Sequence, residues 1–69
     1  MFCLLDKDNI KVAMRKKEIK EVKLKNDELH FYYKDGEHEW FEFYDNQEAE
    51  ESFYDILKQL NEVKKWTVL

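Results

Sequence analysis

Residues 30–44 read HFYYKDGEHEWFEFY, and this stretch decides the fold. It holds seven aromatic residues and two histidines, and Lys34, Asp35 and Gly36 separate its two ring-rich halves. Aromatic residues favour strands, and a short polar break that contains Gly is typical of a β-hairpin. We therefore expect two antiparallel strands, over about 28–34 and 37–44. Rings stand at both odd and even positions, so both faces of this hairpin carry them.

Two loops compete for this hairpin, and they sort the rings differently. A two-residue turn at Asp35 and Gly36 pairs Phe31 with Trp40 and divides the apolar residues between the faces. A three-residue loop, with Gly36 left-handed in a bulge, shifts the register by one residue. Because that shift moves every side chain to the other face, the apolar pattern favours the three-residue loop. One face then carries Leu29, Phe31, Tyr33, Phe41 and Phe43, continued by Val22 and Leu24.

Three further strands are expected before this hairpin, over about 1–5, 10–15 and 19–25. DKDN forms a turn between the first two, and pairing Leu5 with Ile10 across it is one possible register. The stretch RKKEIKEVKLK, residues 15–25, fits either a helical turn or a strand. We favour a turn over 16–18 followed by a strand with alternating apolar residues.

The third and fourth strands are joined by Asn26-Asp27, which is a two-residue hairpin signal. With that turn, Leu24 pairs with Leu29, and Val22 pairs with Phe31. Apolar residues therefore meet apolar residues across the two strands.

A helix is expected over about 46–65. Asp45 followed by Glu48 fits a capping box. Apolar residues recur at steps of three and four and form one stripe, which contains Ala49, Phe53, Ile56, Leu57, Leu60 and Val63. The predicted fold is one α+β domain over 1–69, a small and mainly antiparallel β-meander of four or five strands, with one C-terminal helix packed on one face. Residues 66–69 are either a tail or a short strand that docks on the sheet or on a neighbour.

The chain has 69 residues and one cysteine, so no intrachain disulfide can form. Cys3 lies among apolar neighbours and has no basic partner in sequence, which indicates a small buried side chain and not a nucleophile. Residues 1–5 are too short for a signal peptide, and no run approaches the ~20 apolar residues of a membrane span. We expect a soluble, cytoplasmic protein.

The net charge of −4 hides a strong asymmetry along the chain. Residues 1–25 carry eight basic and four acidic side chains, a balance of +4. Residues 26–55 carry eleven acidic side chains and one basic, a balance of −10. Such a layout affects the choice of partner more than it affects the fold.

The hairpin face opposite the apolar set is the candidate partner-binding surface, and it contains His30, Tyr32, His38, Trp40 and Tyr44. One interpretation is a solvated face made of strand-favouring residues. The other is a protein interface, with a homodimer among its forms, because Trp and Tyr are enriched at such contacts. A metal site built from His30, His38 and Glu42 is disfavoured because no third histidine or cysteine supports it. No catalytic motif, metal or cofactor is predicted.

Two functional hypotheses involve nucleic acid, one by direct binding and one by mimicry. The basic residues of 11–25 could meet phosphates, but the ring-bearing hairpin is itself acidic, so direct binding is disfavoured. The alternative function is an acidic inhibitor of the phage type, which imitates nucleic acid and blocks a nucleic-acid-binding protein. Its surface would comprise Asp35, Glu37, Glu39, Glu42, Glu48, Glu50 and Glu51. The leading expectation is a small non-enzymatic module that binds a protein partner or a second copy of itself through the open ring-bearing face.

Overall fold

The computed structural model describes residues 1–61. Its elements are β1 (Phe2–Lys7), β2 (Ile10–Arg15), the 3-10 turn η1 (Lys16–Glu18), β3 (Ile19–Lys25), β4 (Glu28–Tyr33), β5 (His38–Glu42) and α1 (Asn46–Asn61). Strand β5 therefore ends two residues before the predicted limit, and β1 runs two residues further than expected. The predicted continuation of the helix to residue 65 and the predicted tail or strand at 66–69 lie outside the described residues.

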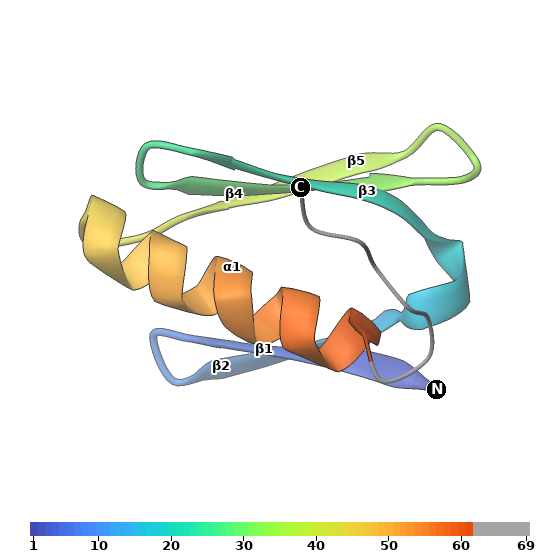
Figure 1. Ribbon diagram of the computed structural model, residues 1–69, viewed down its shortest axis with the longest axis horizontal. Coiled ribbons are helices and arrows are strands. Elements are labelled where there is room, and N and C mark those ends of the chain that lie inside the picture. The colour runs from blue at the N-terminus through green and yellow to red at the C-terminus, as the bar shows by residue number, and fades with distance from the viewer. Residues whose placement is uncertain (62–69) are drawn as a thin grey trace.

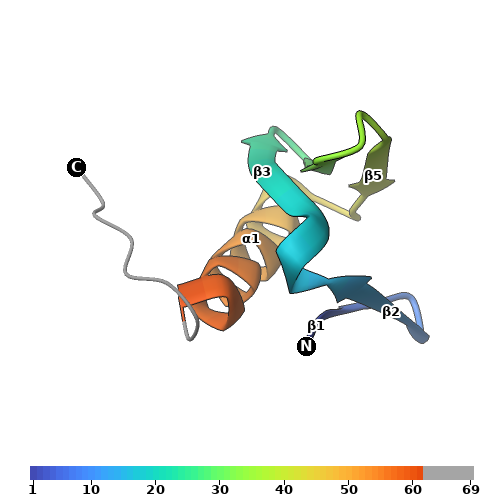
Figure 2. The ribbon, with the colours of Figure 1, turned by 90° about the vertical axis from the view of Figure 1, so that its right-hand side faces the viewer.

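The five antiparallel strands form two sheets, so the α+β class is confirmed and the single meander is wrong. Strands β1 and β2 make one sheet, and β3, β4 and β5 make the other, in that order. Between them, η1 redirects the chain through three charged residues, so that β3 does not pair with β2. Figures 1 and 2 show α1 running alongside both sheets, with the three-stranded sheet on one side and the β1–β2 hairpin on the other. The helix thus packs against two small sheets and does not cross one continuous face.

The β1–β2 hairpin has a tighter loop than DKDN suggested. Lys7 pairs with Ile10 and Leu5 pairs with Val12, so the expected pairing of Leu5 with Ile10 is wrong by two residues. Asp8 and Asn9 have φ values of 50° and 64°, the left-handed conformation that a two-residue turn of type I′ requires. Asp and Asn tolerate that conformation better than other non-glycine residues, which is why this loop closes over two residues.

The three-stranded sheet has the predicted registers. Leu24 pairs with Leu29 and Val22 with Phe31 across β3 and β4. Leu29 pairs with Phe41 across β4 and β5, as the three-residue loop requires. In that loop the Gly36 N–H donates to the Tyr33 carbonyl at 3.0 Å, and Gly36 has φ of 92°. The left-handed bulge glycine is therefore confirmed.

Helix α1 begins as its sequence predicts. The Glu48 N–H donates to Asp45 Oδ1 at 2.8 Å, which satisfies one of the free N–H groups of the first turn. The core draws on both sheets and on the helix, and its buried residues are Cys3, Leu5, Met14, Leu29, Phe31, Phe43, Ala49, Ile56 and Leu60. Phe53 packs against this core but is only partly buried. Within residues 1–61 there is no helix long and apolar enough to cross a membrane.

Helix α1 also holds the free edge of β1. The Gln59 side chain accepts the Leu4 N–H at 2.7 Å and donates to the Leu4 carbonyl at 2.8 Å. An unpaired strand edge is open to pairing with other chains. The Gln59 amide occupies the middle of this edge and so ties the β1–β2 hairpin to the helix.

Candidate functional site

The outer face of the β3–β4–β5 sheet turns away from α1 and from the β1–β2 hairpin (Figure 1). Cross-strand pairing sets which side chains share this face, because residues directly opposite each other point the same way. His30 pairs with Trp40, and Tyr32 pairs with His38. These four side chains, His30, Tyr32, His38 and Trp40, are called the ring surface below.

The four rings of the ring surface stand nearly parallel. Tyr32 and His38 stack with centroids 4.4 Å apart and an interplanar angle of 2°. His30 stacks on His38 at 5.0 Å and on Trp40 at 5.8 Å, with interplanar angles of 16° and 15°. Stacked aromatic pairs add stability beyond the area that they bury. The rings therefore form one ordered cluster, in which Trp40 is still 51% exposed.

Hydrogen bonds join the two histidine rings to each other and to Glu28. His30 Nε2 lies 3.0 Å from Glu28 Oε1, and His30 Nδ1 lies 2.8 Å from His38 Nε2. A contact between two imidazole nitrogens is a hydrogen bond only when one of them carries a proton and the other accepts it. The His30–His38 bond therefore needs at least one neutral ring, and Glu28 can accept the remaining His30 N–H.

Charged side chains surround the ring surface. Lys23 Nζ lies 5.3 Å from the centroid of the Tyr32 ring, a cation–π contact. Glu21 Oε1 lies 3.8 Å from Lys23 Nζ. At the end of the sheet nearer the β3–β4 turn, Glu28 pairs with Glu42. The ring surface thus has a basic group along β3 and a pair of carboxylates at one end.

Tyr44, the fifth predicted residue, stands apart from the other four. It follows the end of β5, in the turn that leads to α1. Its side chain is 90% exposed and makes no ring contact with another described residue. The register prediction extended β5 to residue 44, whereas pairing with β4 ends at Glu42.

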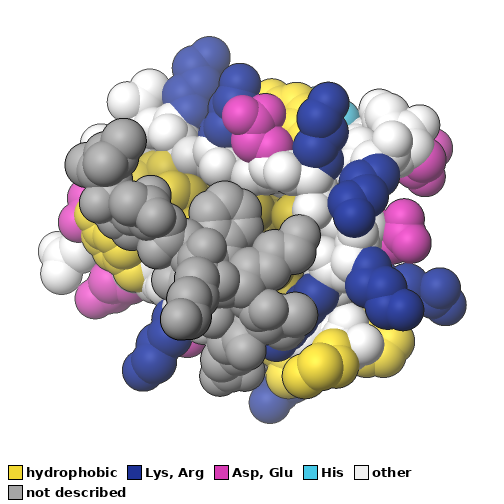
Figure 3. Space-filling view, turned by 45° about the vertical axis from the view of Figure 1, so that its right-hand side comes forward, with side chains coloured by type: hydrophobic (Ala, Val, Ile, Leu, Met, Phe, Trp, Pro, Cys, Tyr) yellow, Lys and Arg dark blue, Asp and Glu magenta, His cyan; other side chains and the backbone are white. Residues whose placement is uncertain are grey.

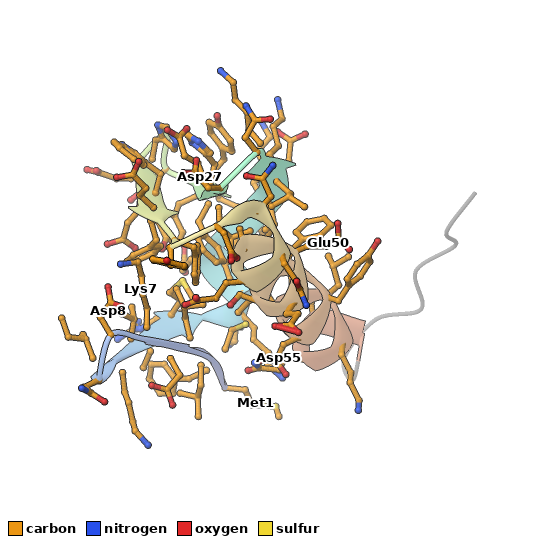
Figure 4. The ribbon with its side chains drawn as sticks, turned by 90° about the vertical axis from the view of Figure 1, so that its left-hand side faces the viewer. Met1, Lys7, Asp8, Asp27, Glu50 and Asp55 are labelled. Atoms are coloured by element: carbon orange, nitrogen blue, oxygen red, sulfur yellow. The ribbon has the colours of Figure 1, made fainter. Side chains whose placement is uncertain are left out.

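The acidic residues that would imitate nucleic acid do not gather on one surface. Asp35 and Glu37 lie in the β4–β5 loop, which Figure 1 places at the opposite end of the molecule from the start of α1, where Glu48 lies. Glu39 accepts the Tyr33 hydroxyl at 2.7 Å and pairs with Phe31, on the core side of the sheet. Figure 4 labels one residue of this set, Glu50, whose side chain extends from α1.

Two groups of side chains on or near this sheet carry possible metal ligands. Among the described residues, His30, His38 and Glu42 do not form a group whose ligand atoms all lie within 4.8 Å of one another. Asp27, Glu28 and Glu42 bring oxygen atoms within 4.8 Å of one another. Carboxylate oxygens suit Ca²⁺ or Mg²⁺, but nothing else at this cluster points to a cation.

Cys3 and Tyr33 are the two groups whose acidity the fold changes most clearly. Burial raises the pKa of the Cys3 thiol, and the nearby Asp55 raises it further against the lowering effect of Lys16. A buried thiol held protonated is a poor nucleophile. Burial also raises the pKa of Tyr33, and so does its hydrogen bond to Glu39. Neither group resembles an activated catalytic residue.

A second exposed apolar surface was missed by the sequence reasoning. Phe2 and Leu4 are 56% and 59% exposed on the outer side of β1, while Cys3 and Leu5 between and beside them are buried. The signal was present, because MFCLL is apolar at every position and a strand has two faces. A continuous apolar strand at the edge of a small sheet predicts that some of its side chains remain exposed.

No protein-family model matches this chain, and neither a curated protein nor a solved structure does.

Proposed function

We propose that this protein is a small, non-enzymatic, cytoplasmic interaction module. It binds a protein partner, in the first instance a second copy of itself, through the ring surface. The observation that carries this proposal is the ordered stack of four rings on a sheet face that the helix leaves open, with Trp40 half-exposed at one side.

Side chains that are already ordered before binding favour association. A side chain that is free before binding loses rotamer freedom at the interface, which costs about 0.5–1.5 kcal/mol per residue. In the ring surface this cost is reduced, because stacking and the His30–His38 hydrogen bond already fix the rings. Trp and Tyr are also the residues that most often dominate the binding energy of protein interfaces.

The surroundings of the ring surface suit a protein partner. Interfaces generally have an aromatic or apolar centre and a polar, solvated rim. Here Lys23 and Glu21 lie along one side, and Glu28 and Glu42 lie at one end. A partner with a flat apolar centre and charges of both signs at its edge would complement this face.

The first experiment measures the molecular mass in solution as the protein concentration is raised, at low and at high salt. The wild type should pass from monomer to dimer, and Trp40→Ala should shift that transition to much higher concentration. Loss of one aromatic residue that dominates an interface typically weakens association by about 2 kcal/mol or more, roughly thirtyfold. Tyr54→Ala is the matched control, because Tyr54 is an exposed aromatic residue on α1, away from the ring surface.

A pull-down with the same three proteins tests for a different partner. Proteins retained by the wild type and by Tyr54→Ala, but lost with Trp40→Ala, support the proposal. Replacing Glu48, Glu50 and Glu51 by Gln should leave retention unchanged. A wild type that is monomeric at every concentration and retains nothing that depends on Trp40 would contradict the proposal.

A further inference from the structure

A separate pocket of about 540 Å³ lies where the end of α1 approaches β3 and the N-terminus. Pockets that bind small molecules typically span about 300–1,000 Å³ and have mainly apolar walls. This pocket has a wall of apolar side chains: Met1, Ile19, Val22, Leu57 and Leu60. It uses none of the four residues of the ring surface, so it is independent of the proposed interaction site.

The pocket follows from the path of the chain around η1. The Lys34 N–H donates to the Glu18 carbonyl at 2.8 Å, which brings the end of β4 beside η1. The register of β3 shifts between Ile19 and Glu21, so Lys20 lies at an irregularity of the strand. Strand β3 is also an edge of its sheet, and no described strand covers this side.

The rim of the pocket is positively charged. Lys17, Lys20 and Lys34 are exposed at the rim and have no ion pair with any residue of 1–61. Lys16 donates to the Gln59 carbonyl at 2.9 Å. Glu21 is the acidic residue of the lining, and it lies 3.8 Å from Lys23. In the view of Figure 3, Lys and Arg side chains, in dark blue, lie along the top and the right of the described surface, with some Asp and Glu side chains among them.

We propose that this pocket binds an amphiphilic anion, namely an alkyl chain with a single anionic head group, such as a medium-chain fatty acid. The apolar wall accommodates the alkyl chain, and the lysines at the rim meet the head group. Lysine acts on anions as a compact point charge with three rotatable donors, so the charge of the head group matters more than its shape. A neutral ligand would leave the lysines without a counter-charge, and a cationic one would be repelled.

Decanoate, below its micelle concentration, is the probe for a titration of the full chain followed by calorimetry and by amide NMR shifts. We expect saturable one-to-one binding, with the largest shifts at Ile19, Val22 and Leu57. Each additional methylene that the pocket buries should tighten binding roughly fourfold, so octanoate should bind more weakly and dodecanoate more tightly. Decyl sulfate should bind like decanoate, and the matching decyltrimethylammonium ion should not bind.

Lysine variants separate this site from general detergent binding. Joint replacement of Lys20 and Lys34 by Gln should weaken decanoate binding roughly fivefold, since exposed ion pairs contribute about 0.2–1 kcal/mol each. Lys11→Gln is the control, because Lys11 is exposed on β2 and does not line the pocket. Absence of saturable binding, equal binding of the cationic probe, or shifts centred on Leu4 or on Trp40 would overturn the proposal. Self-association through the ring surface would be unaffected by any of these results.

Discussion

Replacing Phe31 by Ala tests the assignment of the hairpin faces most strongly. The Phe31 side chain is 0% exposed and lies in the core, where the Phe41 ring meets it edge-on with centroids 5.9 Å apart. Truncation of a buried Phe to Ala costs about 3–5 kcal/mol, from lost transfer energy and from the cavity that remains. A chain of this length has a total stability of about 3–10 kcal/mol. Phe31→Ala should therefore remove a third or more of the stability and can unfold the protein at room temperature.

Tyr32→Ala is the matched comparison, because Tyr32 is the next residue and lies on the outer face. This change removes the stacking on His38 and the contact with Lys23. Cross-strand pairs and exposed cation–π contacts contribute roughly 0.2–1 kcal/mol each, so the expected loss is about 1 kcal/mol. The two adjacent substitutions should thus differ by at least about 2 kcal/mol.

Urea unfolding followed by far-UV circular dichroism measures both losses. The protein concentration must stay low, since self-association would add stability by mass action. If Tyr32→Ala costs as much as Phe31→Ala, or more, the assignment of faces in this hairpin is wrong. An unfolded Phe31→Ala protein beside a folded Tyr32→Ala protein agrees with it.

Three further substitutions or reagents test other contacts. Gln59→Leu should lower the free energy of unfolding, measured in urea, by about 1–3 kcal/mol, because the two hydrogen bonds to Leu4 are lost. Gln47→Leu, at an exposed residue in the first turn of α1, should lower it little. Equal losses would refute the role of Gln59 in holding the edge of β1. The raised pKa of Tyr33 means that its neutral form stabilises the fold fully below pH ~10, and that this contribution falls as the pH rises further. Between pH 9 and 11 the wild type should therefore lose more stability than Tyr33→Phe, and parallel pH profiles would contradict the Tyr33–Glu39 contact. Cys3 should react with a thiol reagent only after urea unfolding, and rapid labelling of the native protein would show that the β1–β2 hairpin does not cover it.

The register of the ring-rich hairpin could be predicted because each of the two possible registers puts a different set of side chains on the core face. A shift by one residue would have moved Phe41 and Phe43 to the outer face and Trp40 to the core face, and only the observed register keeps the apolar set together. The structure has that arrangement, with Leu29 opposite Phe41 and Phe43 buried. The prediction succeeded because burial of apolar area distinguishes the two registers.

The register of the β1–β2 hairpin could not be predicted in the same way. The expected and observed pairings differ by two residues, and a shift of two leaves every side chain on the same face. The apolar pattern therefore does not distinguish the two registers, and the conformation of the turn sets the pairing. Asp8 and Asn9 both adopt left-handed conformations, which closes the loop over two residues in place of four.

The division of the strands into two sheets could not be predicted from the alternation of apolar and polar residues either. Alternation in 10–15 and 19–25 shows which side chains are buried, but not which strand pairs with which.

The side-chain contacts of the ring surface could not be predicted from the sequence pattern either. Periodicity placed His30 and His38 on one face, whereas the hydrogen bond between them, and that from His30 to Glu28, depend on rotamers. The exposure of Phe2 and Leu4 depends on which elements pack against the outer face of the β1–β2 sheet, and an apolar run does not reveal that.

Fluorine NMR of the protein labelled with 5-fluorotryptophan tests most directly whether the ring surface makes the contact. The chain contains two tryptophans, so Trp40→Phe assigns the Trp40 resonance by its loss. Trp40 lies half-exposed at the side of the ring stack, where a partner would change its surroundings. We expect the Trp40 resonance to move in step with the rise in average mass as the protein concentration increases. A mass that rises while the Trp40 resonance stays unchanged would show that the protein associates through another surface.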